Sequence, residues 1–167
     1  MFWAKNICAL CALCFCLCLS GAALAGEKAD MVIVDKSERM LYLKKGDKIF
    51  KSFPIVLGDN PIGHKQQEGD RRTPEGRYVL DFKNRNSKYY KSIHISYPNK
   101  EDVRNARKRG VKPGSGIVIH GSPGGISFSS RFKRREDWTD GCIAVGNSDM
   151  NQIWNAVDVN TPILILP

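Results

Sequence analysis

Histidine and cysteine, the side chains that most often bind transition metals, are scarce in this 167-residue sequence after residue 18. Five of its six cysteines lie within residues 8–18, and the sixth is Cys142. A solitary thiol cannot close an internal disulfide, which excludes a disulfide-stapled fold for the rest of the chain. The three histidines, His64, His94 and His120, form no H-x-x-x-H pattern, and Cys142 belongs to no C-x-x-C pair. The sequence therefore predicts no metal site.

Acidic residues and long apolar runs are also few. Asp and Glu number 17 against 26 Lys and Arg, which gives a formal net charge of +9. The only apolar stretch that approaches the length of a membrane span is residues 7–25. Hydrophobic residues make up 42% of the chain, enough for the core of one domain. A disordered chain and a multi-span membrane protein are excluded.

The first 25 residues have the pattern of a secretory signal peptide. Lys5 precedes the apolar run 7–19, and the small residues Ala23-Leu24-Ala25 follow it. We expect cleavage between Ala25 and Gly26, with residues 26–167 exported to the periplasm or beyond as one domain. No stable membrane span would remain after cleavage. The alternative is an uncleaved anchor, since residues 7–25 are just long enough to cross a bilayer.

The rest of the chain is richer in strand signals than in helix signals. Short runs of β-branched and aromatic residues predict strands, and a Gly- and Pro-rich polar stretch predicts one long loop. A helix capped by Asn99 and a second one capped by Asn147 or Ser148 are expected. We predict a mainly β fold, a sandwich or half-open barrel with one or two short helices. The expected strands are residues 31–34, 40–43, 49–57, 77–82, 92–97, 116–119, 142–145 and 162–166, with the loop at 58–76 and the helices at 100–109 and after 147.

One pair of residues can carry nucleophilic chemistry. His120 ends a predicted buried strand, and Cys142 follows Gly141 at the start of another, 22 positions later. A thiol nucleophile needs a base within hydrogen-bond reach and N–H groups that face the oxyanion. The bland alternatives are a buried, inert cysteine and a histidine that only stabilises a turn. A lone thiol in an exported protein, next to a glycine, favours the catalytic interpretation.

Two motifs make this interpretation specific. The first consists of His120-Gly121 and residues 139–143 (Thr-Asp-Gly-Cys-Ile). The 18 residues from Gly121 to Trp138 separate His120 from Thr139. The second is the Arg-Thr-Pro-Glu-Gly element at residues 72–76. Together they resemble the catalytic domain of the YkuD-like L,D-transpeptidases. Asp140 stands where that family usually has a second histidine, which resembles its YafK-like branch.

The resemblance implies an acyl transfer through a thioester, with the stem peptides of peptidoglycan as partner and with no cofactor. Cys142 would be the nucleophile and His120 the general base and acid. The carbonyl of Gly121 would orient His120, and the N–H of Gly141 would hold the oxyanion. Positions beside the motifs, and the exposed side of a strand, suggest further contacts to substrate. The candidates are Arg72, His94, Arg131, Arg134, Thr139 and Asp140.

Two other functions stay open at this point. A cysteine hydrolase on the same fold would use Cys142 and His120 to cut the bond between diaminopimelate and a D-amino acid or an attached lipoprotein. A basic, non-catalytic wall-binding module would use only the positive charge. Nucleic acid is not an expected partner, because the sequence contains none of the recognisable motifs for binding it. The sequence makes no prediction about the oligomeric state.

Overall fold

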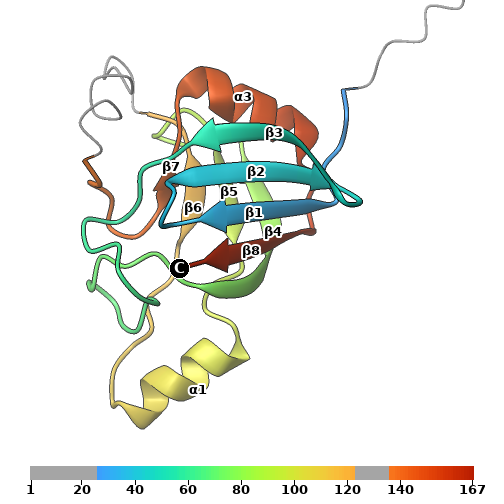
Figure 1. The fold of residues 1–167 in the computed structure, drawn as a ribbon. Helices are drawn as coiled ribbons and strands as arrows, with labels where there is room; N and C mark the ends of the chain where they lie inside the picture. The colour runs from blue at the N-terminus through green and yellow to red at the C-terminus, as the bar shows by residue number, and fades with distance from the viewer. Residues whose placement is uncertain (1–25, 123–135) are drawn as a thin grey trace, which may run out of the picture.

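The computed structural model describes residues 26–122 and 136–167. They form one curled sheet of eight strands in the order β3-β2-β1-β8-β4-β5-β6-β7 (Figure 1). The mainly β fold is confirmed, and the half-open barrel is the form it takes. The strands are β1 (Met31–Asp35), β2 (Met40–Lys45), β3 (Lys48–Pro54), β4 (Gly76–Asn84), β5 (Ser92–Ile95), β6 (Val118–His120), β7 (Ile143–Ala144) and β8 (Thr161–Leu166), and the helices are α1 (Lys100–Lys108) and α3 (Asn147–Ala156).

The first three strands form the expected antiparallel meander. Alternate residues of each strand point into the core, so that Val32 and Val34 are fully buried and so are Leu41 and Leu43. The prediction that the third strand continues to residue 57 was wrong. It ends at Pro54, and Val56 instead forms an isolated antiparallel bridge with Ala144 of β7.

Strand β8 closes the sheet by joining its two halves. It pairs in parallel with β1 and antiparallel with β4, which brings the end of the described chain beside its beginning. Its residues Ile163 and Ile165 are 1% exposed and complete the hydrophobic core between the strands. The sheet therefore supplies a rigid frame for the strands that follow β4.

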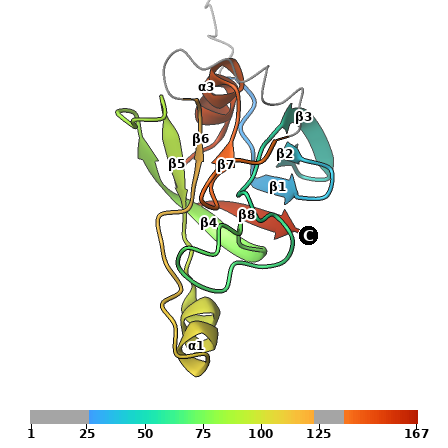
Figure 2. The ribbon, with the colours of Figure 1, turned by 90° about the vertical axis from the view of Figure 1, so that its left-hand side faces the viewer.

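Helix α1 extends away from the sheet (Figures 1 and 2). Its first turn is closed by a capping box, in which the Asn99 side chain accepts from the N–H of Asp102 and the Asp102 carboxylate accepts from that of Asn99. Asp102 also accepts a hydrogen bond of 3.0 Å from the Tyr78 hydroxyl and contacts His64 Nε2 at 3.1 Å. One buried carboxylate thus joins the helix to β4 and to the long loop.

Helix α3 and the residue that follows it pack on the core through apolar side chains. Met150, Ile153 and Val157 are fully buried. The predicted N-cap was wrong, because the cap position is Gly146, which offers no side chain. The Asn147 side chain is used elsewhere: its Oδ1 accepts a hydrogen bond of 2.7 Å from the Ser122 N–H, just beyond β6.

The long loop before β4 is fixed by buried lysines. Lys36 is 2% exposed, and its Nζ donates to Glu75 at 2.6 Å and to the Gly63 carbonyl at 2.8 Å. Lys65 is 3% exposed and donates to Asp70 at 2.8 Å. A loop held by such paired charges keeps a defined shape, since breaking a buried pair costs several kcal/mol. In the described part of the chain, no helix has the length and apolar character needed to cross a membrane.

Candidate active site

Strands β6 and β7 bring the predicted histidine and cysteine onto one face of the sheet. The two strands are parallel, with Ile119 paired to Ile143, and both isoleucines point into the core. His120 follows Ile119, and Cys142 precedes Ile143. Because side chains alternate along a strand, His120 and Cys142 both lie on the opposite face, diagonally across the two neighbouring chains. Their 22-residue separation in sequence is thus closed by one strand pairing.

The imidazole of His120 is buried and held in one tautomer. The residue is 2% exposed, and its Nδ1 lies 2.6 Å from the carbonyl oxygen of Gly121. A carbonyl oxygen only accepts hydrogen bonds, so the proton resides on Nδ1 and Nε2 carries a free lone pair. Burial also lowers the pKa of His120 below its usual value. The side chain is therefore neutral at neutral pH and able to accept a proton at Nε2.

Two aromatic residues that the sequence interpretation missed contact this histidine. The Tyr89 ring lies against the imidazole with a centroid distance of 4.5 Å, and Trp138 meets it edge-on at 5.9 Å. The fold brings both rings to His120, and no signal in a single sequence marks them as its neighbours.

Cys142 is the one free cysteine in the described residues, and it is half-buried. Its S–H donates to the carbonyl of Gly116, with 3.7 Å between sulfur and oxygen. Burial raises the pKa of the Cys142 thiol above its usual value, and the negative charge of Asp140 raises it further. The thiol of Cys142 and the imidazole of His120 are consequently both uncharged near neutral pH.

The turn that precedes Cys142 is fixed by the Thr139 hydroxyl. Its Oγ1 donates to the Cys142 carbonyl at 2.7 Å and accepts from the Gly141 N–H at 3.1 Å. Thr139 is 4% exposed and shapes the turn through these bonds, and its contact with substrate stays a prediction. The Gly141 N–H, expected to hold the oxyanion, is occupied by this bond. Across residues 26–122 and 136–167, no acceptor is bound to the N–H of Cys142.

Two glycines let three backbone segments meet at this turn. Gly141 has a φ of +120°, and a Cβ built on it would lie 2.5 Å from the carbonyl oxygen of Arg72. A Cβ on Gly58 would lie 1.9 Å from the carbonyl oxygen of Arg71 and 2.9 Å from the Cα of Gly141. Any side chain at either position would push the segments apart. The Arg-Thr-Pro-Glu-Gly element therefore contacts the catalytic motif directly, backbone against backbone.

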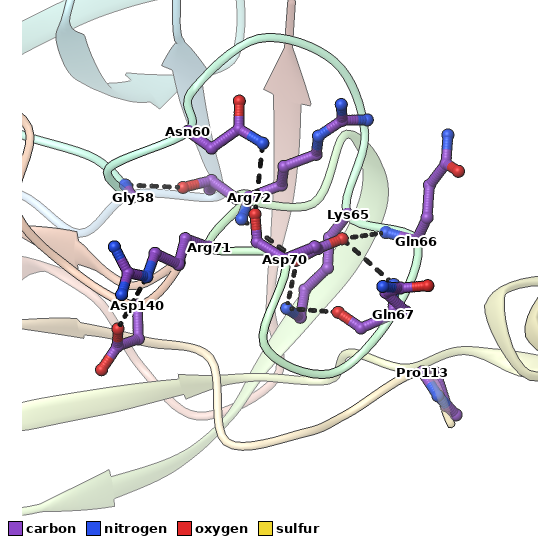
Figure 3. A network of polar contacts seen from close by, with 12 residues as sticks. Gly58, Asn60, Lys65, Gln66, Gln67, Asp70, Arg71, Arg72, Pro113 and Asp140 are labelled. Carbon is purple, nitrogen blue, oxygen red and sulfur yellow. Dashed lines mark hydrogen bonds and ion pairs between the residues drawn. The ribbon is translucent and has the colours of Figure 1, made fainter. Parts of the chain in front are cut away.

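The two neighbouring arginines point in different directions (Figure 3). The guanidinium of Arg72, the predicted substrate contact, lies 3.5 Å from the position of a Cβ on Gly63. Arg71 instead faces Asp140, with 3.9 Å between Nε and Oδ1, and also pairs with Asp59 at 2.7 Å. Asp140 is exposed, as expected for a carboxylate that pairs with an arginine. The arginine side chain beside the turn that precedes Cys142 is thus Arg71, and a contact between Arg72 and substrate stays a prediction.

The other predicted contacts divide into two groups. His94 lies on β5 opposite Val118, which places it on the same face of the sheet as His120. Its Nδ1 is 2.6 Å from Asp81, and its side chain is 31% exposed. Arg131 and Arg134 lie outside the described residues.

A pocket of about 420 Å³ opens beside the catalytic turn, with Asp140 and Arg71 in its lining. Ser115 and Ile117 form another wall, on either side of the Gly116 carbonyl that accepts from the thiol. The described residues contain no group of three or more His, Cys, Asp or Glu side chains arranged to hold a metal ion. Thiol chemistry needs a nucleophile and a base, and the thiol of Cys142 and the imidazole of His120 are of the types that can supply them.

Comparison with known proteins finds relatives of this chain in sequence and in structure. YafK of Escherichia coli K12, provisionally named an L,D-transpeptidase, is 31% identical over 128 residues, which are 73% of this chain and 44% of YafK. The helical cell shape determining protein Pgp2 of Campylobacter jejuni is 29% identical with a TM-score of 0.59, over 81% of this chain and 46% of Pgp2. Bd1075 of Bdellovibrio bacteriovorus is 28% identical with a TM-score of 0.56, over 81% and 47% of the two chains.

The chain spans about half the length of these relatives. The match to the family itself is nearly complete, because the YkuD description of the L,D-transpeptidase catalytic domain covers residues 29–165. It includes both motifs and all of the sheet except Leu166, the last residue of β8. The chain belongs to the YkuD family of L,D-transpeptidase catalytic domains.

Proposed function

We propose that this protein is a cysteine-dependent acyl transferase acting on the stem peptides of peptidoglycan. One observation carries the proposal. The Gly121 carbonyl holds the proton of His120 on Nδ1, so that the basic Nε2 is available on the face that also bears the Cys142 thiol. Membership of the L,D-transpeptidase family supports the same substrate class.

The reaction would begin with the transfer of the thiol proton to Nε2 of His120. The sulfur of Cys142 then bonds to the carbonyl carbon that follows the L-centre of diaminopimelate, and the oxyanion formed there accepts from the Cys142 N–H. As the C–N bond breaks, Nε2 returns its proton to the departing amine of D-Ala. An acceptor amine then attacks the thioester carbonyl carbon and gives its proton to Nε2 of His120. The C–S bond breaks, and His120 returns that proton to the sulfur of Cys142.

The uncharged resting states of His120 and Cys142 suit a site in which the thiol loses its proton only when substrate is present. Burial lowers the pKa of His120 and raises that of Cys142, so that neither group is charged near neutral pH. A neutral thiol resists oxidation better than a thiolate does. The thiol would turn from the Gly116 carbonyl to Nε2 when substrate enters.

Hydrolysis of the same thioester is the second candidate, and the position of Asp140 favours it. The Asp140 side chain is 97% exposed beside the catalytic turn, where its carboxylate can accept a hydrogen bond from an incoming water molecule. Water would replace the acceptor amine, and the stem would be shortened instead of joined. Cys142 and His120 would keep their roles.

Export is part of the proposal. Cleavage after Ala25 would release residues 26–167 into the periplasm, where peptidoglycan is found. The chain is related to Pgp2, whose name connects that protein with cell shape. A contribution of this protein to cell shape through stem-peptide remodelling follows from that relationship.

The proposal is tested by incubating the purified protein with a disaccharide tetrapeptide. Mass spectrometry of the intact protein should show an acyl adduct on Cys142, and Cys142→Ala should show none. Cross-linked dimers among the products indicate transfer, whereas tripeptides alone indicate hydrolysis. His120→Gln, which keeps a side chain of similar size, should lower the acylation rate by about 100-fold or more. Turnover by Cys142→Ala would refute the proposal.

A further inference from the structure

The pocket beside the catalytic turn contains charges of both signs that the chemistry at the thiol does not use. Arg71 and Asp140 line it together, and Glu68 and Lys65 are also part of its lining. Lys65 is not available to a ligand, because its buried Nζ donates to Asp70 at 2.8 Å and to the Gln67 carbonyl at 3.1 Å (Figure 3). The cation that remains for a ligand is Arg71.

The backbone of Arg71 has a fixed conformation, whereas its side chain is exposed. Its φ of +57° is a left-handed conformation that only a few per cent of non-glycine residues adopt. The close approach of Gly58 to the Arg71 carbonyl, and a hydrogen bond of 3.3 Å from the Asn60 N–H to that oxygen, maintain this conformation. Residues in strained conformations of this kind cluster at ligand sites.

The partners of Arg71 are exchangeable. The side chain of Arg71 is 57% exposed, while Asp59 and Asp140 are 52% and 97% exposed. Exposed ion pairs contribute little to stability, so that a ligand can displace them at small cost. A carboxylate alone would suit Arg71 but would be repelled by Asp140. A group with both a carboxylate and an ammonium would satisfy the two side chains at once.

We propose that Arg71 and Asp140 recognise the free amino-acid end of the diaminopimelate side chain, with the carboxylate on Arg71 and the ammonium on Asp140. This inference rests on the proposed function, since it places the donor stem at Cys142. The zwitterion would replace the Arg71–Asp140 pair with two charge-assisted contacts. The pocket would therefore select stems in which both ends of that group are unmodified.

The test compares three tetrapeptide donors: unmodified diaminopimelate, its side-chain carboxamide and its side-chain N-acetyl form. The rate of acyl-adduct formation on Cys142 is measured for each. The protein should prefer the unmodified donor over each modified one by about tenfold or more. Arg71→Gln should reduce the preference over the carboxamide to within about twofold, and Asp140→Asn should do the same for the N-acetyl donor. Arg71→Lys should retain part of the preference.

Arg104→Gln and Asp47→Asn are the matched controls, because both residues are exposed and neither lines the pocket. Both should behave as the unsubstituted protein. Equal rates of the unsubstituted protein with all three donors would overturn this inference and leave the acyl transfer intact. Failure of every donor to acylate Cys142 would overturn the proposed function itself. Loss of rate in Arg71→Gln with the preferences unchanged would assign Arg71 a purely structural role and refute the inference.

Discussion

Gly141 and Gly58 lie so close to the backbone carbonyls of the two arginines that alanine at either position should destabilise the protein. Three alanine substitutions distinguish the two causes, which are a forced positive φ and a steric clash. A Cβ at Gly46 would meet nothing within 4 Å but would be forced to a φ of +56°. A Cβ at Gly58 would meet the Arg71 carbonyl oxygen at 1.9 Å, with no such φ. A Cβ at Gly141 would meet both problems, a φ of +120° and an oxygen at 2.5 Å.

The magnitudes follow from these differences. Gly46→Ala should cost about 1–2 kcal/mol of unfolding free energy, the conformational penalty of a left-handed residue. Gly58→Ala should cost about 3 kcal/mol, because backbone cannot rotate away as a side chain can. Gly141→Ala should combine both penalties and cost about 3–5 kcal/mol, which lowers the melting temperature by about 10 °C or more.

Urea unfolding followed by circular dichroism measures the three free energies, and the rate of Cys142 acylation by a tetrapeptide gives the functional effect. Gly141→Ala should abolish acylation, since the turn must shift. Gly46→Ala should leave it unchanged, since that residue lies in the β2–β3 turn. If Gly141→Ala is as stable as Gly46→Ala to within about 0.5 kcal/mol, the close packing of these backbones is refuted.

Three further predictions concern protons and hydrogen bonds at the site. The raised pKa of Cys142 predicts that the rate of alkylation by iodoacetamide climbs about tenfold per pH unit from pH 6 to 9, whereas a plateau below pH 8 would reveal a preformed thiolate. Thr139→Val should cost about 1–3 kcal/mol in chemical denaturation, because the buried Gly141 N–H loses its acceptor, and Thr139→Ser should restore it. The lowered pKa of His120 means that the unfolded chain binds its proton first as the pH falls below 6.5. The protein should therefore lose stability in that range more steeply than His120→Gln does, and identical pH profiles of the two proteins would contradict this.

Much of the fold could be predicted because hydrophobic alternation reports burial directly. The strands around Val32, Leu41 and Ile163 follow that pattern, and the first helix begins directly after Asn99, its predicted N-cap. The end of β3 at Pro54 could not be predicted. Residues 55–57 are as apolar as a strand continuing in the meander, and only the sheet decides which partner they take.

The sequence indicates Cys142 and His120 through a lone thiol after a glycine and a histidine at a strand end, and their catalytic roles stay a prediction. The contacts around these two residues could not be predicted. Which of two adjacent arginines faces the pocket depends on the left-handed backbone of Arg71, a property that sequence does not reveal. The same applies to Tyr89, which reaches His120 from the hairpin between β4 and β5 through tertiary packing alone.

Strand β7 has only two residues, and it takes its hydrogen bonds from chain segments that are far away in the sequence. Val145 N–H bonds to the His120 carbonyl, and Ala144 exchanges two bonds with Val56, which is 88 positions earlier. Contacts that close such long loops form late in folding, because their entropy must be lost before the contact stabilises anything. The β1–β3 meander should accordingly form first, and the nucleophile should reach its working position only in the final stage of folding.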